Sequence, residues 1–208
     1  MNIKRLIIQI VLLIAVIFLT FEIYSSIMEP VRFKKVIQER ENLIKERLGY
    51  IKNLQVEYKR INANYTPSFD TLIDFYNHGI MPMVMKRGTV PDTLTELEAL
   101  ELGIITRDTS YIAIKDTLLK EEANFDITKL AYVPFTHPRK KFEMQAGFVT
   151  RANFQIPVFE VRCEMKDYLA NIKQQELLIN EIGLMDQEEE FPGLILGSME
   201  EPSTDGNW

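Results

Sequence analysis

The chain has 208 residues, of which 46% are hydrophobic and 26% are charged, and its formal net charge is −6. This length predicts one domain with at most an appendage, and the acidic balance argues against a nucleic-acid partner, because phosphate contacts need a basic surface. Cys163 is the only cysteine, which excludes an intramolecular disulfide and a thiolate metal cage.

The N-terminus is strongly apolar. Residues 6–27 (LIIQIVLLIAVIFLTFEIYSSI) contain one amide, Gln9, and one acid, Glu22. A helix of that length, at about 1.5 Å per residue, matches a hydrocarbon core of roughly 30 Å. A cleaved signal peptide has a shorter apolar region and a small-x-small site, which YSSIMEP does not supply. We therefore predict a membrane anchor over residues 1–30, with Glu22 at the interface or paired with a partner helix.

The orientation of this anchor stays open at the level of sequence. Lys4 and Arg5 precede the apolar run and favour a cytoplasmic N-terminus. Further basic residues follow the run and favour the opposite topology; they are Arg32, Lys34, Lys35 and Arg40. Counting charges does not decide between the two.

Residues 31–64 are predicted to form a long amphipathic helix. Ile37, Ile44, Ile51 and Tyr58 recur every seven residues and make one narrow apolar stripe on a charged rod. The stripe either packs its C-terminal half on the chain's own domain or forms a seam with copies of itself or with partner helices. Under the second interpretation, Ile37, Ile44 and Ile51 contact a partner.

Residues 65–208 are predicted to form a small α+β domain that begins with two helices. Ser68 is typical of an N-cap, and Gly79 ends the helix that follows it. A second helix is expected from Asp92 to Leu102, with Gly103 as its stop.

Beyond Gly103 the apolar pattern alternates, which predicts a meander of about four antiparallel strands covered by the long helix. The predicted strands are Thr109–Leu119, Lys129–Phe135, Phe142–Arg151 and Ile156–Met165. Residues 167–185 suit either a strand or a helix, and we favour a helix. A short strand, Leu194–Gly197, precedes a polar tail. The fold class is thus α+β: a transmembrane helix continuing into an amphipathic helix that packs on a small antiparallel sheet.

The sequence contains no familiar catalytic motif: there is no HExxH, GxSxG, glycine-rich phosphate loop or GxGxxG. His78 and His137 are far apart in sequence, and Cys163 ends an apolar strand, which is typical of a buried small residue. We therefore expect no catalysis and no cofactor.

Acidic residues near the C-terminus offer candidate metal ligands, in the stretch Asp186–Glu190 and in the tail that follows it. Asp205, with Glu200 and Glu201, could give hard oxygen ligands to Ca²⁺, although a solvated acidic loop explains the same residues.

The order of these segments resembles that of type IV pilins and type II secretion pseudopilins. Pro30 follows the apolar run, and LGYIKNLQVEYKRINANYTPSFDTLIDF resembles the pilin stretch in which a helix ends at a tyrosine before YP and a short helix. The ending LGS…DGNW is similar to the calcium-binding end of major pseudopilins, which implies Asp205 as a ligand. The chain departs from the pattern because it has no Gly-Phe-Thr-Leu cleavage sequence and no acid near the start of the apolar run.

These observations predict a non-catalytic structural or assembly component of a bacterial envelope complex, pilin-like in layout. We expect a single pass through the inner membrane, a periplasmic C-terminal domain, and partners that are other envelope proteins or copies of itself. One alternative is a single-span scaffold of a secretion or pilus machine that does not polymerise. Another is a sensor domain that binds a ligand or peptide.

Overall fold

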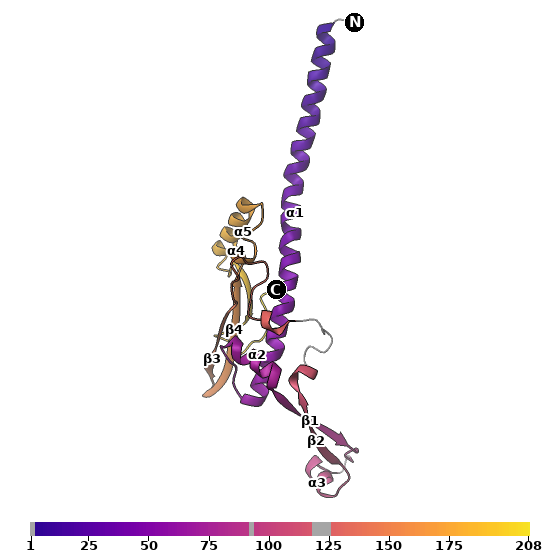
Figure 1. Cartoon of the computed structure of the whole chain (residues 1–208), viewed down its shortest axis with the longest axis vertical. Coiled ribbons are helices and arrows are strands. Elements are labelled where there is room, and N and C mark those ends of the chain that lie inside the picture. Colours follow the sequence, from indigo (N-terminus) through magenta and orange to yellow (C-terminus); the bar gives the residue numbers. More distant parts are fainter. Residues whose placement is uncertain (1–2, 92–93, 118–125) are drawn as a thin grey trace.

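A computed structural model describes residues 3–91, 94–117 and 126–208, with side chains from Ile7 onward (Figure 1). The helices are α1 (Ile3–Asn62), α2 (Phe69–His78), α3 (Glu96–Glu101), α4 (Met165–Tyr168) and α5 (Gln175–Gln187), with two short 3-10 helices, η1 (Ile114–Asp116) and η2 (Ile127–Lys129). The strands are β1 (Ile80–Arg87), β2 (Thr106–Ala113), β3 (Glu143–Arg151), β4 (Phe154–Glu164) and β5 (Gly193–Gly197). The fold class is α+β, as predicted.

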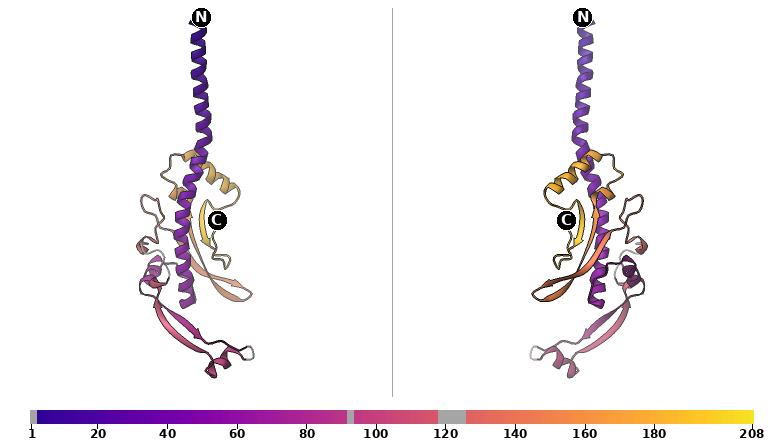
Figure 2. Two further views of the ribbon diagram at one scale, coloured as in Figure 1. Left: turned by 90° about the vertical axis from the view of Figure 1, so that its right-hand side faces the viewer. Right: turned by 90° about the vertical axis from the view of Figure 1, so that its left-hand side faces the viewer.

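The long helix α1 is continuous for 60 residues, which corresponds to about 90 Å. Its N-terminal half stands clear of the domain (Figures 1 and 2), and residues 7–27 are all exposed. Pro30 lies inside the helix without ending it. Within the described residues, α1 is the helix that is long and apolar enough to cross a membrane.

The C-terminal half of α1 is the centre of the hydrophobic core. Ile44, Leu48, Ile51 and Leu54 are 0% exposed, and they recur at the three- and four-residue spacing that places them on one side of a helix. Full burial of each such side chain contributes about 1.5–3 kcal/mol. The stripe therefore packs on the chain's own domain, the first of the two interpretations that the sequence allowed.

The sheet that receives this stripe has the order β3-β4-β5 and is antiparallel throughout. Ala152 and Asn153 join β3 to β4 with φ angles of 48° and 67°, as a two-residue hairpin turn with positive φ at both positions requires. The central strand β4 is buried over Val158–Val161. The three strands predicted near residues 142–151, 156–165 and 194–197 are confirmed.

The prediction of a four-stranded meander is wrong for the two strands expected at residues 109–119 and 129–135. The strand predicted from Thr109 begins at Thr106 and pairs with β1, which the sequence pattern did not reveal. Residues 129–135 form a turn and a loop with a single bridge, Tyr132↔Lys141, because Pro134 has no N–H to donate to a ladder and Phe135 adopts a φ of 66°. Of the strand predicted to reach Leu119, residues 118 and 119 lie outside the described residues.

The chain reverses direction after α1 through a clamp made by Gln55. This side chain is 0% exposed, its Nε2 donates to the Thr66 carbonyl at 2.6 Å, and its Oε1 accepts from the Thr66 N–H at 3.1 Å. Ser68 then caps α2 as predicted, since its Oγ accepts from the Thr71 N–H. The clamp satisfies buried backbone groups that would otherwise be unpaired, and so fixes where the helix ends.

The helices of the domain follow the predictions with shorter bounds. The helix expected over residues 92–102 is α3, which Thr95 caps with a reciprocal bond to Glu98, while residues 92 and 93 lie outside the described residues. The ambiguous stretch 167–185 contains the end of α4 and most of α5, so the favoured helix is confirmed over 175–185, while residues 169–174 between the two helices are not helical.

The helix α4 is fixed to α1 by two polar contacts. Arg40 donates to the Tyr168 carbonyl at 2.5 Å, and the Tyr168 hydroxyl donates to Glu41 at 3.0 Å. Phe33, the first buried residue of α1, is 3% exposed. It lies six residues after Ile27, or about 9 Å along the helix, so the domain begins almost directly beyond the apolar segment.

Two leucines of α1 give a direct test of this core. Leu48→Ala should lower the free energy of unfolding by about 2–5 kcal/mol, because Leu48 is 0% exposed and its loss leaves a cavity. Leu43→Ala is the matched control, since Leu43 is 49% exposed, and it should change stability by about 0.5 kcal/mol or less. Urea unfolding of the full chain in detergent micelles, followed by Trp208 fluorescence, measures both. Equal effects would show that α1 does not supply the core.

Candidate functional site

The structure separates the residues that the sequence proposed for partner contact. Ile44 and Ile51 belong to the domain core, so the prediction is corrected: the fold closes both to a second chain. Ile37 is half-buried and packs against the same core. Glu22 is exposed on the apolar half of α1, and its role with a partner helix stays a prediction.

The acidic residues near the C-terminus do not converge. Asp205 pairs with Lys52 of α1 at 3.1 Å, and Glu201 pairs with Arg151 of β3 at 3.3 Å. In the part of the chain that the structure describes, no three His, Cys, Asp or Glu side chains gather into a set that could hold a metal ion. The calcium site expected at Asp205, Glu200 and Glu201 is therefore corrected: two of these carboxylates face separate cations.

The C-terminal tail instead extends the sheet. The Ile195 N–H donates to Asn207 Oδ1 at 3.0 Å, and Asn207 Nδ2 donates to the Gly193 carbonyl at 3.0 Å. The Asn207 N–H donates to the Ile195 carbonyl at 3.1 Å, and Leu196 bridges to Gly206. The tail thus covers the outer edge of β5, which an open sheet would leave exposed to pairing with other chains.

A hairpin that projects from the domain carries nine exposed apolar side chains among the described residues. We call it the arm: β1, α3 and β2 with their connections. It leaves the domain beyond the end of α1, away from the N-terminus (Figures 1 and 2). Its exposed apolar residues are Ile80, Met83, Val84, Met85, Leu97, Leu100, Leu102, Ile104 and Tyr111. Contiguous exposed apolar patches are typical of interaction surfaces, so the arm is a candidate for one.

The strand register gathers part of this group on one face. Pro82 pairs with Tyr111, and Val84 pairs with Thr109. Paired residues share a face and alternate residues along a strand share it too, so Ile80 joins them. We call these five residues the arm face. Tyr111 is 70% exposed, and Ile80 and Val84 are more than half exposed.

Both ends of the arm are held in place. At its root, Ile114 is 0% exposed and its N–H donates to the Gly79 carbonyl at 3.0 Å. At its tip, Glu96 of α3 pairs with Arg107 at 2.9 Å and with Lys86 at 3.0 Å. Hydrogen bonds from Arg107 and then Lys86 hold the pKa of Glu96 below its usual range. These contacts support a two-stranded sheet that would be marginal alone in water.

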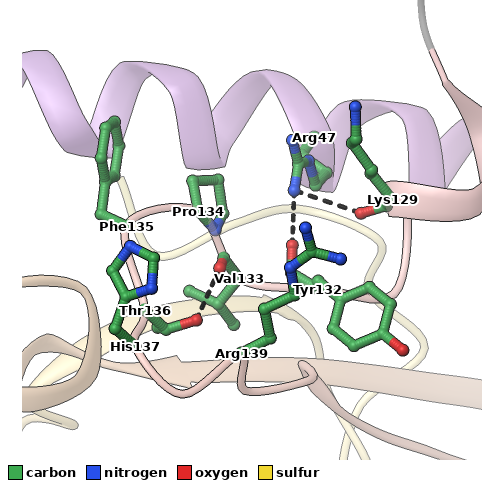
Figure 3. A pocket seen from close by; sticks show the side chains of 9 residues that line it. All are labelled: Arg47, Lys129, Tyr132, Val133, Pro134, Phe135, Thr136, His137 and Arg139. Carbon is green, nitrogen blue, oxygen red and sulfur yellow. Dashed lines mark hydrogen bonds between the residues drawn. The ribbon is translucent and has the colours of Figure 1, made fainter.

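A pocket of about 220 Å³ lies between α1 and the loop that follows η2 (Figure 3). It is lined by Arg47, Lys129, Tyr132, Val133, Pro134, Phe135, Thr136, His137 and Arg139. Four of these nine can carry a positive charge, and none is a carboxylate. The side chains come from α1 and from one loop, so folding is needed to bring them together.

The loop that forms this pocket is held by specific contacts. Arg47 Nη1 donates to the Lys129 carbonyl at 3.1 Å and to the Tyr132 carbonyl at 2.5 Å. Thr136, which is 6% exposed, donates to the Val133 carbonyl at 2.9 Å and accepts from the backbone N–H of Lys140 at 3.0 Å. A ligand entering a pocket whose walls are fixed in this way would not incur the entropy cost of ordering the loop.

A second hollow of about 230 Å³ adjoins the first and shares Thr136, His137 and Arg139 with it. Its other lining residues include Lys140 and Asp167, whose side chains pair at 2.6 Å. The hydrogen bond to Asp167 raises the pKa of Lys140 and keeps it charged. Asp167 thus offsets the charge of Lys140 in the second hollow, whereas the described residues that line the first include no acid.

The remaining candidates from the sequence are Cys163, His78 and His137. Cys163 is 4% exposed and lies opposite Leu194 in the sheet, and burial raises the pKa of its thiol to about 12. A thiol in this state is not a nucleophile at neutral pH. His78 is exposed and contacts Asp74 one turn earlier, while His137 lines the pocket.

The arm and the pocket are the two features that sequence reasoning missed. The cluster THPRKK was a signal for the pocket, because it concentrates four basic residues in an acidic chain. Arg47 gave no signal, since it lies on a charged helix among many other charges.

The fold defines a class: a small α+β domain on a helix that, within the described residues, is long and apolar enough to span a membrane. Comparisons with models of protein families, with curated proteins and with solved structures found no match.

The buried thiol makes a prediction about reactivity. In the folded full chain at pH 7, Cys163 should resist a maleimide, and it should react rapidly in urea, because burial excludes the reagent and keeps the thiol protonated. Mass spectrometry of the labelled chain measures this. Equal labelling rates with and without urea would contradict the buried position.

The same thiol contributes to the pH dependence of stability. Its pKa is about 12 in the folded chain and about 8.5 when unfolded, so the unfolded chain loses the proton first as pH rises. The contribution to stability is present below about pH 8.5 and is lost above it. Replacing Cys163 with Ala should reduce this alkaline slope.

Proposed function

We propose that the protein is a non-catalytic, membrane-anchored structural or assembly component of a bacterial envelope complex, and that copies of it associate through the arm. One observation carries this proposal: the exposed apolar segment and the core of the domain are both parts of α1. One continuous helix supplies the exposed apolar segment and the core of the domain, so the segment and the domain form one rigid unit.

The pilin-like layout supports an assembly role. In this layout a single helix is apolar and exposed at its N-terminal end and covered by an antiparallel sheet at its other end, as in Figure 1. We propose an inner-membrane anchor with the domain in the periplasm. Glu22 remains the proposed contact within the membrane, because an acid in an apolar helix favours a polar partner.

The geometry of the arm favours a second copy of the chain as its partner. Anchoring in one membrane gives all copies the same orientation, and the rigid α1 sets the arm of each copy at the same height. The arm faces of two neighbours therefore meet at one level, and each spans about 13 Å along β1, from Ile80 to Val84. At the tip, Glu96 is already paired with two cations, which limits repulsion between copies.

A scaffold that does not polymerise is the second candidate. It is favoured by the departures from the pilin sequence pattern, which are the missing cleavage sequence and the missing acid near the start of the apolar run. In that case the arm face binds a different protein of the same complex.

Topology is tested by thiol labelling in whole cells. Glu200→Cys in a Cys163→Ala background places one exposed thiol on the domain. We expect a membrane-impermeant maleimide to label it without lysis of the inner membrane, as a periplasmic domain requires. Labelling only after lysis would place the domain in the cytoplasm and would overturn the envelope proposal.

Association through the arm is tested by cross-linking in intact membranes. Val84→Cys in the Cys163→Ala background should give a product of dimer size under mild oxidation, because Val84 lies on the arm face. Adding Tyr111→Glu should reduce that product about tenfold, since it places a charge in the contact while the exposed site tolerates the change.

Glu200→Cys is the matched control, because it is exposed but lies outside the arm. It should give little dimer. Equal dimer from both positions, or none from Val84→Cys, would overturn self-association. A product of another size from Val84→Cys alone would favour the scaffold.

A further inference from the structure

We propose that α5 lies against the lipid headgroups of the membrane in which α1 is anchored, with its exposed apolar side chains in contact with lipid. This inference rests on the proposed membrane anchor, but it needs neither a periplasmic domain nor association through the arm. Three observations carry it: the apolar side chains of α5 that the core leaves uncovered, the position of α5 in the fold, and the cations of α1 near that position.

The helix α5 has more apolar side chains than the core covers. Six of its 13 residues are large and apolar: Leu177, Leu178, Ile179, Ile182, Leu184 and Met185. Leu178 is the buried one, whereas Ile179 is 66% exposed and Leu184 is 56% exposed among the described residues. A surface helix usually keeps its apolar residues in one stripe toward the core and its charges on the opposite side. The helix α5 departs from this pattern, because two of its apolar side chains lie outside the stripe.

These two side chains flank the outer side of α5. At about 100° per residue, Ile179 and Leu184 lie roughly 100° and 120° from Leu178, in opposite directions around the helix. Ile182 and Met185 pack on the core with Leu178, so the outer side is the one between Ile179 and Leu184. This outer side holds a single charge; its residues are Glu176, Asn180, Gly183 and Gln187. Such a surface enters a headgroup layer at low cost, because few charges lose water there.

The fold places α5 near the apolar segment. Figures 1 and 2 show α5 at the end of the domain from which the N-terminal half of α1 emerges. Phe33, the first buried residue of α1, lies about 9 Å beyond Ile27 and belongs to the same core cluster as Leu178. A headgroup layer is roughly 5–8 Å thick, which is half the difference between a whole bilayer and its hydrocarbon core. With Ile27 at the edge of the hydrocarbon, this end of the domain therefore meets the headgroups.

Cations of α1 lie at the same end. Arg32, Lys34 and Lys35 follow Ile27 by five to eight residues, or about 8–12 Å along the helix, and all three are exposed. Basic side chains at this depth are attracted to the phosphates of anionic lipids.

The acids that follow α5 lie toward the sheet. They are residues 188–190, and the chain enters β5 directly after them. The carbonyl of Pro192 accepts from the Met165 N–H at 2.9 Å, which ties this stretch to the end of β4. The acids therefore oppose contact between α5 and headgroups less than their number in the sequence indicates.

Lipid suits the outer side of α5 better than a second protein chain does. A stable protein interface buries about 800 Å² on each partner around a contiguous apolar centre. Ile179 and Leu184 are separated by a polar strip, so they form no such centre. Lipid chains and headgroups adapt to two separate apolar side chains, because they have no fixed shape.

Spin labels in nanodiscs test the inference. The full chain, in a Cys163→Ala background, carries one nitroxide at Ile179→Cys and is inserted at one chain per disc of phosphatidylcholine and phosphatidylglycerol. We expect the label to collide several-fold less often with a water-soluble nickel chelate than a label at Phe154→Cys does. Phe154 is the matched control, because it is a 72% exposed apolar residue on the β3–β4 hairpin, at the other end of the domain (Figure 1). A label at Ile14→Cys, on the apolar segment, reports insertion of the anchor.

A double variant separates lipid contact from shielding by the protein itself. With the label at Asn180→Cys, Ile179→Ser and Leu184→Ser together should raise nickel access to the level at Phe154, because they remove the apolar contacts with lipid. Both residues are exposed, so the variant should keep the unfolding temperature of the parent chain.

Three results would overturn the inference. Equal nickel access at Ile179 and Phe154, with Ile14 protected, would show that α5 stands in water although the anchor is inserted. Protection of Ile179 only in discs that hold several chains would assign the surface to a second copy. Free nickel access at Ile14 would overturn the anchor and this contact together, so the two failures are distinguishable.

Discussion

The structure depends on one contact: the apolar stripe of α1 against the sheet. The same helix that provides a membrane-compatible segment also provides Leu48, Ile51 and their neighbours to the core, and those side chains are completely buried. Without α1 the three-stranded sheet would expose one face to water, and a sheet of this size has no second layer of comparable area. The domain is therefore not an independent body attached to a stalk, because the stalk is its second layer.

This dependence explains how the polar features are positioned. Arg40, Arg47 and Lys52 extend from the helix to three different parts of the domain: the carbonyl of Tyr168, the carbonyls of the pocket loop and the carboxylate of Asp205. Each contact joins residues more than 80 positions apart. A charged helix that appeared solvated in the sequence thus uses its cations to fix loops, and the pocket results from one of these contacts.

The parts of the fold that could be predicted are those set by local chemistry. The apolar run, the Ser68 cap and the alternating strands on either side of Ala152 and Asn153 each carry their signal within a few residues. The arm could not be predicted in the same way, because β1 (IMPMVMKR) contains a proline and three methionines, which are poor indicators of a strand. Its pairing with β2 also spans α3, so no short turn connects the two strands.

The candidate sites were harder to predict for a physical reason. A seven-residue spacing shows that a helix has an apolar side, but it does not show which surface covers that side. Ile44 and Ile51 fit a partner seam and a core equally well in sequence, and only the packing decides. The pocket likewise requires Arg47 and Arg139, which belong to separate elements, to be brought together by folding.

The continuity of α1 through Pro30 also has a rotational consequence. An α-helix turns by about 100° per residue, so Glu22 lies within about 40° of the direction in which Ile44 points. Ile44 points into the domain, and Glu22 therefore lies on the same side of α1 as the domain. A helix that paired with Glu22 would therefore approach α1 from the same side as the domain, and the packing of the core would set that direction.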